Sequence, residues 1–256
     1  MTHAAPTLVD LNAHLLPDLD DGMSSTDRAV ARVREAEADG VRVLYAVASH
    51  KNAPTAHVTT AHRRLQRAVE RAGVSVEIEA GHQAILHEGL AQDFARGHIL
   101  PLGSSGYVFV ELPCDRFPSY TLDVLYHLTL EGARLLLIHP ELNAGLQHNA
   151  ALVRKLCDME VVGVAAARHL RRQSPRGIRH STLSLIESGL VQAVASHAGR
   201  DADRPARLTD VAPLLSRQFG DGAADSLLHA TPHAIRSGLP VEMRPRGRRS
   251  LVSWFS

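Results

Sequence analysis

The most constraining feature of this sequence is a recurring pattern of apolar, strand-like stretches that run into polar or metal-binding side chains. The pattern occurs seven times, at residues 7–14, 41–50, 74–83, 107–111, 133–139, 161–167 and 190–197. In parallel α/β folds, the C-terminal ends of the strands share one face, and active sites are built there. Polar residues that are far apart in the sequence are therefore expected to line one pocket.

Histidine and glutamate are prominent at these strand ends, and both side chains bind divalent transition metals. The chain also carries 16 histidines among its 256 residues. This pattern favours a metal-centred hydrolase, or a descendant of one, over other α/β proteins.

The segments between the strands show the apolar spacing and the end signals of amphipathic helices. In the first of them, the hydroxyls of Ser25 and Thr26 can cap a helix whose apolar positions include Ala29 and Val33, and Gly40 can end it. This alternation predicts parallel strands joined by crossover helices, and seven such units predict a closed or nearly closed barrel. A doubly wound open sheet is the alternative. The absence of a glycine-rich phosphate loop after the first strand disfavours it.

Composition predicts one domain and leaves the partner open. With 45% hydrophobic residues, the chain can bury one large core, which we place at residues 7–240. The arginine-rich residues 241–256 are expected to form a disordered, basic tail. A net charge of +1 offers no field for nucleic acid or an anionic membrane. With two cysteines, no signal peptide and no long apolar segment, we expect a cytoplasmic protein without a transmembrane segment. Its oligomeric state stays open.

Eight short motifs, in this order and spacing, resemble one family from about residue 9 to residue 238. The motifs are VDLNAH (9–14), LDDG (19–22), ASH (48–50), GHQ (81–83), VELP (110–113), IHPE (138–141), ASHAG (195–199) and DRP (203–205). They resemble the bacterial protein-tyrosine phosphatases of the polymerase-and-histidinol-phosphatase (PHP) superfamily, which are associated with capsular and exopolysaccharide kinases. The resemblance implies a distorted (βα)7 TIM-like barrel that holds three divalent ions, usually manganese, at the C-terminal ends of its strands.

The resemblance also implies nine metal-ligand positions. Five keep the family's residue, namely His14, Asp21, His50, Glu111 and His139. Four depart from it: the family has histidine where this chain has Asn12, glutamate at Gln83, aspartate at His197 and histidine at Gly199. A family arginine that binds the phosphate corresponds to Leu142, whereas the phosphate-binding Arg204 is kept.

These departures predict a depleted metal site. Amides are weak ligands and glycine offers no side chain, and two of four acidic ligands are lost where three divalent ions would bring about six positive charges. Fewer than three ions are therefore expected. His197 remains a good nitrogen ligand, and with His14, Glu111 and His139 it can form a single site for manganese, zinc or iron.

Two classes of function follow. The first is a weakly active phosphatase for phosphotyrosine on the tail of a polysaccharide-assembly kinase, with Arg204 stabilising the developing charge. The second is a non-catalytic pseudophosphatase that binds a phosphorylated partner or regulates a kinase, and the four departures favour it. A different metal-dependent barrel hydrolase is a minor alternative, because Asn12 breaks the His-x-His pair expected there.

Overall fold

Seven strands alternate with helices along the chain, and each strand runs parallel to the next. The computed structural model describes residues 7–19, 22–199 and 204–247. The strands are β1 (Leu8–Ala13), β2 (Val41–Ser49), β3 (Glu77–Ile85), β4 (Tyr107–Glu111), β5 (Arg134–Ile138), β6 (Val162–Ala166) and β7 (Val191–Ala195). Each falls within or close to a stretch predicted from the sequence.

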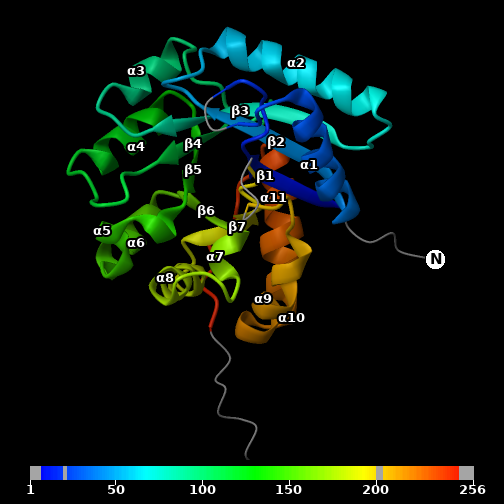
Figure 1. Ribbon diagram of the computed structural model, residues 1–256. Coiled ribbons are helices and arrows are strands. Elements are labelled where there is room, and N and C mark those ends of the chain that lie inside the picture. Colours follow the sequence, from blue (N-terminus) through cyan, green and yellow to red (C-terminus); the bar gives the residue numbers. More distant parts are fainter. Residues whose placement is uncertain (1–6, 20–21, 200–203, 248–256) are drawn as a thin grey trace, which may run out of the picture.

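Helices cover the outside of the sheet (Figure 1). They are α1 (Thr26–Ala38), α2 (Thr55–Arg71), α3 (Leu90–Ala95), α4 (Thr121–Leu130), α5 (Ala144–Gln147), α6 (Ala150–Asp158), α7 (Ala167–Leu170), α8 (Arg176–Glu187), α9 (Ala212–Phe219), α10 (Asp221–Asp225) and α11 (Thr231–Arg236). Short 3-10 turns η1 (Pro140–Leu142) and η2 (Thr209–Val211) and the π-helical turn η3 (Ser226–Ala230) complete the set. Among the described residues, no helix is long and apolar enough to cross a membrane.

The strands follow one another around the sheet in chain order, from β1 to β7. The first and last strands meet at their C-terminal ends, where Ala13 bridges Ala198 and the His197 N–H donates to the Asn12 carbonyl at 2.9 Å. Below that point, η3 and α11 pack against both strands. The predicted barrel is therefore confirmed, as a nearly closed and distorted one rather than an open sheet.

A buried carboxyl fastens the seam between β1 and β7. Both the backbone N–H and the hydroxyl of Ser196 donate to Asp10, which is fully buried. Burial raises the pKa of Asp10 to about 6, although these hydrogen bonds oppose the shift. This seam lies next to Asn12 and His197, so it holds two candidate site residues in register.

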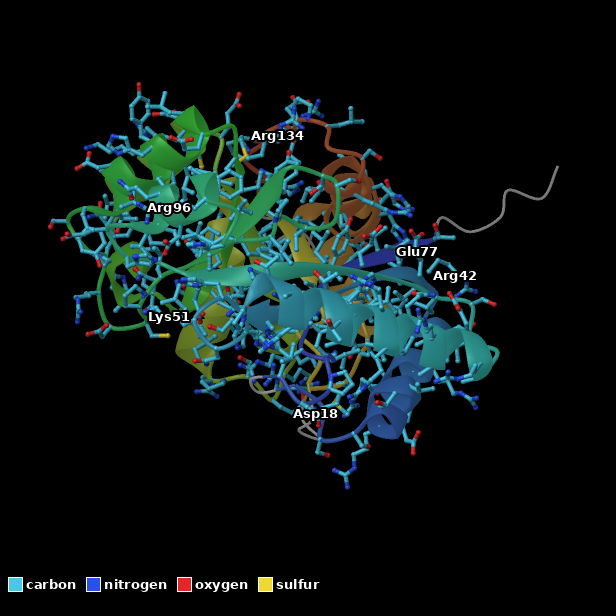
Figure 2. All side chains as sticks on the ribbon, turned by 90° about the horizontal axis from the view of Figure 1, so that it is seen from above. Asp18, Arg42, Lys51, Glu77, Arg96 and Arg134 are labelled. Carbon is cyan, nitrogen blue, oxygen red and sulfur yellow. The ribbon has the colours of Figure 1, made fainter. Side chains whose placement is uncertain are left out.

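Alternate strand residues, such as Val9, Val43 and Phe109, fill the barrel interior. The two ends of the barrel are well separated, as Arg42 at the start of β2 and Lys51 beyond its end show in Figure 2. The candidate site residues lie at the C-terminal end, whereas Val241 and Met243 pack against the apolar cluster of the barrel interior.

Part of the segment that the sequence analysis assigned to a disordered tail packs against the barrel. Val241 and Met243 pack against the interior cluster. The Arg246 guanidinium then donates to Gln192 at 2.6 Å, and its backbone N–H donates to the Glu187 carbonyl at 2.9 Å. Residues 241–247 have no helix or strand, but they are held against the barrel. The rest of the predicted tail, 248–256, lies outside the described residues.

Candidate functional site

Side chains from the ends of five strands gather at the C-terminal end of the barrel. Asn12, His14, Gln83, His139 and His197 are all buried there, each less than 9% exposed. Glu111, at the end of β4, is half-buried. The structure thus brings together polar groups that span about 185 residues of sequence, as the pattern of strand ends predicted.

Three of these side chains form a hydrogen-bonded row that we call the amide half: Asn12, Gln83 and Glu111. A carboxylate only accepts hydrogen bonds, so the 2.8 Å contact with Glu111 Oε2 fixes Gln83 Nε2 as the donor. Gln83 Oε1 then accepts from Asn12 Nδ2 at 3.4 Å. Asn12 Oδ1 is left to accept from His197 Nδ1 at 2.8 Å. The row has a single direction, and it places the His197 proton on Nδ1.

The other side of the pocket, which we call the imidazole half, consists of His139, Glu141, His169 and His197. Glu141 is fully buried and accepts from His169 Nδ1 at 2.6 Å and from the Ala166 N–H at 3.0 Å. Burial alone would raise the pKa of Glu141, but the two facing histidines outweigh it and lower that pKa to about 2. Glu141 is therefore a buried carboxylate that faces two imidazoles.

Glu141 also orients His139. Its Oε1 lies 3.6 Å from His139 Nδ1, longer than a hydrogen bond but close enough to favour a proton on that nitrogen. The lone pair of His139 is then on Nε2. A carboxylate behind a histidine in this way is the common support of a metal-ligating imidazole.

The two lone-pair nitrogens meet in the pocket. His139 Nε2 lies 3.2 Å from His197 Nε2 and 2.9 Å from His197 Nδ1, and the rings are nearly perpendicular. The His14 ring stands edge-on to His197, with centroids 4.7 Å apart. Burial, and then the neighbouring His139, His14 and arginines, hold the pKa of His197 well below its ordinary value. His139 Nε2 is nearer to the protonated Nδ1 of His197 than to its Nε2, so a small rotation of one ring would be needed before both free nitrogens face one cation.

Backbone strain marks the same two histidines. His139 and His197 each have a φ of 52°, in the left-handed region that few residues other than glycine adopt. Such a conformation costs about 1–3 kcal/mol and is concentrated at functional sites. Their sharp turns out of β5 and β7 aim both rings inward.

Arg204 takes the space that a side chain at position 199 would use. A Cβ built on Gly199 would lie 2.6 Å from the Arg204 Cζ, and the Arg204 Nε donates to the His197 carbonyl at 3.1 Å. The guanidinium is buried, at 8% exposure. The absence of a side chain at position 199 therefore leaves the space that Arg204 occupies.

The donor set favours one ion over three. In the amide half, amide hydrogens face Gln83 Oε1 and Glu111 Oε2, so an ion there would compete with these hydrogen bonds. In the imidazole half, two nitrogens 3.2 Å apart match the spacing of about 3.3 Å expected for ligands at about 2.0 Å from a tetrahedral zinc. The next imidazole is His14, whose ring centroid lies 4.7 Å from that of His197.

His50 belongs to a different cluster. It stacks on His87, with ring centroids 5.6 Å apart, and Asp93 completes a group whose ligand atoms lie within 4.8 Å. However, the Ile85 N–H donates to His50 Nδ1 at 3.2 Å, which places the proton of the neutral ring on Nε2. In this conformation His50 has no lone pair to offer an ion. Asp21 lies outside the described residues.

Sequence reasoning assigned no role to Glu141, His169 or Arg168, although Glu141 was part of a motif. Arg168 Nε donates to His169 Nε2 at 3.1 Å, which links all three residues. The signal was present, because Arg168 and His169 directly follow the strand predicted at 161–167. The same logic that selected His139 and His197 would have found them.

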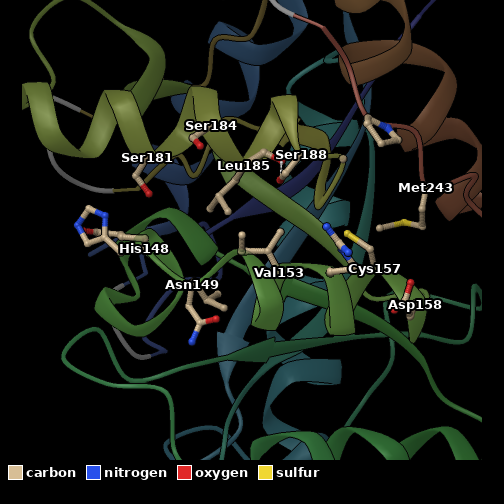
Figure 3. A pocket seen from close by; sticks show the side chains of 16 residues that line it. His148, Asn149, Val153, Cys157, Asp158, Ser181, Ser184, Leu185, Ser188 and Met243 are labelled. Atoms are coloured by element: carbon tan, nitrogen blue, oxygen red, sulfur yellow. Dashed lines mark hydrogen bonds between the residues drawn. The ribbon is translucent and has the colours of Figure 1, made fainter.

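The molecule also has a groove on its outer side, between α6 and α8 (Figure 3). Its volume is about 780 Å³, and Val153, Leu185 and Met243 are among its lining residues. None of the candidate ligands is among its lining residues.

Comparison with known proteins agrees with this fold. Residues 8–236 match the family described as capsular polysaccharide synthesis, CpsB/CapC. The chain is 26% identical to the tyrosine-protein phosphatase YwqE of Bacillus subtilis over 97% of this chain and all of that one. It is 24% identical to the putative tyrosine-protein phosphatase CapC of Staphylococcus aureus, over 77% and 79% of the two chains.

Solved structures show the same fold. A structure from a study of YwqE from Bacillus subtilis and CpsB from Streptococcus pneumoniae, described as metal-dependent tyrosine phosphatases, superposes with a TM-score of 0.86. It is 23% identical and covers 94% of this chain and 99% of that chain. With the family match extending from the first strand to the last described helix, the chain belongs to the CpsB/CapC family of capsular polysaccharide synthesis proteins.

Proposed function

We propose that this chain acts on phosphotyrosine in the tail of a polysaccharide-assembly kinase, as a slow phosphatase with a single-ion site. The observation that carries the proposal is the convergence of His139 Nε2 and His197 Nε2 beside the buried guanidinium of Arg204. These groups would place positive charge and nitrogen ligands around one phosphoryl group. The tyrosine-phosphatase names of the relatives support the substrate class.

Arg204 would bind and orient the phosphate. A guanidinium pairs with two phosphate oxygens at once, and the contact of Nε with the His197 carbonyl fixes its position. Its low exposure excludes water, which strengthens the attraction.

The imidazole half would hold the ion. His139 and His197 would be its ligands, and Glu141 would keep the His139 proton on Nδ1. Imidazole ligands suit zinc or iron as well as the manganese implied by the family resemblance. When bound, the ion supplies positive charge to the transferring phosphoryl group. The free cysteines Cys114 and Cys157 are in keeping with action in a reducing cytoplasm.

Slow turnover follows from the amide half. Its amide hydrogens occupy the ligand oxygens on that side, so a second and a third ion have no complete sites. Two-ion phosphatases use such a second ion to stabilise the attacking and leaving oxygens together. Here that charge would be missing in the transition state.

A second candidate is a non-catalytic phosphotyrosine-binding protein. It is favoured by the continuous row from Glu111 to His197, which satisfies these polar groups without any ion. In that case Arg204 would bind the phosphate, and no hydrolysis would follow.

One experiment separates the two candidates. A phosphotyrosine peptide and its unphosphorylated form are titrated into the protein by calorimetry, with free phosphate measured in the same samples, with and without zinc or manganese. Arg204→Ala should abolish the preference for the phosphorylated peptide, and Arg204→Lys should keep part of it. Release of phosphate that requires added metal supports the slow phosphatase. Preference without release supports the binding protein, and equal affinity for both peptides rejects both candidates.

A further inference from the structure

The groove between α6 and α8 runs up to the C-terminal strap, by which we mean residues 243–247. His148 and Ser181 lie at one end of the groove, and Met243 and Asp158 lie at the other (Figure 3). Its volume of about 780 Å³ is within the range of ligand-sized pockets. The groove is therefore large enough to hold several side chains.

The lining of the groove is largely apolar, with one buried hydroxyl. Leu146, Val153 and Leu185 line it, and each is less than 9% exposed. Ser181 also lines it and is 5% exposed, and its Oγ has no hydrogen-bond partner among the described residues. Buried polar groups are nearly always paired. Such a groove suits a peptide, which offers apolar side chains together with backbone carbonyls that can accept from a hydroxyl.

The strap forms one wall of the groove and fixes where the chain leaves it. Met243 and Pro245 are among the lining residues. The Arg246 N–H then donates at 2.9 Å to the carbonyl of Glu187, the last residue of α8. The described part of the chain therefore ends, at Gly247, beside the same end of the groove as Met243.

The sequence that follows Gly247 contains a short apolar run. Arg248 and Arg249 come first, and residues 251–255, which we call the apolar segment, read LVSWF. The segment includes Trp254, the single tryptophan of the chain. Contiguous apolar surface of this kind marks an interaction site when it is exposed on a soluble protein. The apolar segment therefore calls for an apolar surface to bury against.

The length and charge of this sequence match the groove. Five extended residues span about 16 Å, and the nine residues of α6 rise about 14 Å along one side of the groove. The four steps from Gly247 to Leu251 allow about 13 Å of chain, which is enough to turn back into it. At the end near Met243, the exposed Asp158 offers a carboxylate to the two arginines.

We propose that this groove binds the apolar segment of the same chain. Leu251 would enter at the Met243 end, and Trp254 would lie between α6 and α8, near Ala150 and Ser181. This intramolecular docking goes beyond the proposed function and does not depend on it. It would join α6, α8 and the strap into one unit and close the groove to other partners.

The fluorescence of Trp254 reports on the segment directly, because the chain has no other tryptophan. Emission and quenching by acrylamide are measured in the full chain as wild type, as Ala150→Glu and as Ala151→Glu. Ala150 lines the groove, whereas Ala151 is exposed and is not among its lining residues. Both changes put an acidic residue in the first turn of α6, where the helix dipole favours it, so they are matched. Thermal melting verifies that each variant is folded.

In the wild type, we expect blue-shifted emission and quenching several-fold slower than in a free peptide of residues 248–256. Ala150→Glu puts a charge into the groove, so it should shift the emission to the red and raise quenching to the rate of the peptide. Ala151→Glu should behave as the wild type. Neither signal should change with protein concentration, because the docking occurs within one chain.

The thiol of Cys157 gives a second readout that leaves the groove itself unchanged. Cys157 lines the groove and is half-buried. In a Cys114→Ser background, its rate of reaction with a thiol reagent is compared in the full chain with and without the paired changes Trp254→Ser and Phe255→Ser. The paired changes should speed the reaction several-fold. Ser256→Ala, just outside the apolar segment, should leave the rate unchanged.

The docking is rejected if Trp254 is quenched in the wild type as fast as in the free peptide, or if Ala150→Glu leaves slow quenching intact. An unchanged rate at Cys157 in the paired variant also rejects it. Slow quenching that is lost on dilution, together with a dimer in sedimentation, would place the segment in the groove of a second copy. Protection that requires vesicles of phosphatidylglycerol and phosphatidylcholine would assign it to a membrane surface. Either result overturns docking within one chain.

Discussion

The two halves of the pocket pair their buried polar groups in different ways. In the amide half, each polar group has a partner in a row that ends on the Glu111 carboxylate. In the imidazole half, a buried carboxylate, Glu141, faces two imidazoles, and His139 Nε2 lies 3.2 Å from His197 Nε2. Buried polar groups must be paired, and only the second half leaves its pairing to be completed by a cation.

The difference teaches that the four positions at which the resemblance implies other residues in the family are coupled to one another in this structure. Asn12 and Gln83 bond to each other, His197 bonds to Asn12, and Gly199 leaves room for Arg204. Each change suits the others. A change in one member alone would leave a buried partner unsatisfied, which costs about 1–3 kcal/mol.

The largest expected effect is a difference in zinc affinity between a variant of the imidazole half and a variant of the amide half. Removing a ligand nitrogen in His139→Ala should abolish tight binding of zinc, because the nitrogens left would be too few for a stable site. The matched change in the amide half, Gln83→Ala, should leave zinc affinity within about threefold of the wild type. Calorimetric titration with zinc measures both. Equal losses in the two variants would mean that the halves do not differ.

The next effect concerns Glu141, which acts through His139 rather than on an ion. Glu141→Gln should weaken zinc affinity by about 10–100-fold, because the carboxylate behind the imidazole raises its basicity and fixes its proton. Zinc titration of Glu141→Gln and Glu141→Asp checks this, with Asp expected to keep part of the affinity. Unchanged affinity in Glu141→Gln would show that the carboxylate serves only to hold His169.

Restoring the residues that the resemblance assigns to the family should change both halves of the pocket. The combined change Asn12→His, Gln83→Glu, His197→Asp and Gly199→His is expected to raise turnover of a small aryl phosphate by about tenfold or more, because a second charge can then act on the phosphoryl group. Each single change should have little effect. Gly199→His alone should even be harmful, since its Cβ would lie 2.6 Å from the Arg204 Cζ. A single change that restores full turnover would contradict the coupling.

The smallest effect is a dependence of the free energy of unfolding on pH. It comes from His82, which directly precedes Gln83 of the amide half. His82 is fully buried, and its ring nitrogens bond to the Ala53 carbonyl at 2.9 Å and the Leu100 N–H at 3.0 Å. Burial lowers the pKa of His82 to about 4 from 6.5. As the pH falls from 6.5 towards 4, the unfolded chain gains a proton that the folded chain does not, so stability falls, by at most about 3 kcal/mol.

Urea unfolding of the wild type and of His82→Gln at several pH values measures that dependence. The loss between pH 6.5 and 4 should be smaller in His82→Gln. The raised pKa of Asp10 acts in the opposite direction in both proteins, so it cancels in the comparison. Equal slopes would show that His82 takes up its proton without unfolding.

The fold was predictable because it depends on periodicity, which the sequence displays directly. Apolar strands, helix ends at residues such as Gly40, and polar strand ends were all visible, and seven parallel strands in chain order confirm the barrel. Val241 and Met243 were not recognised as part of the core. The segment is rich in arginine and was therefore interpreted as polar, although the partners of its two apolar side chains lie in the barrel interior.

The pocket was only partly predictable, because its chemistry depends on proton positions and on pairs that are distant in sequence. Strand ends identified His139 and His197, and the family resemblance identified Arg204. The direction of the row through Gln83 and Asn12 depends on distances from residues on other strands, which no local pattern reports.

The most direct test of the account is the metal content of the full chain purified without chelator and measured by elemental analysis. The converging nitrogens of His139 and His197 predict no more than one tightly held divalent ion per chain, and the satisfied amide half predicts no second or third. Three ions per chain at full occupancy would contradict the account, because the row from Glu111 to His197 would then have to break.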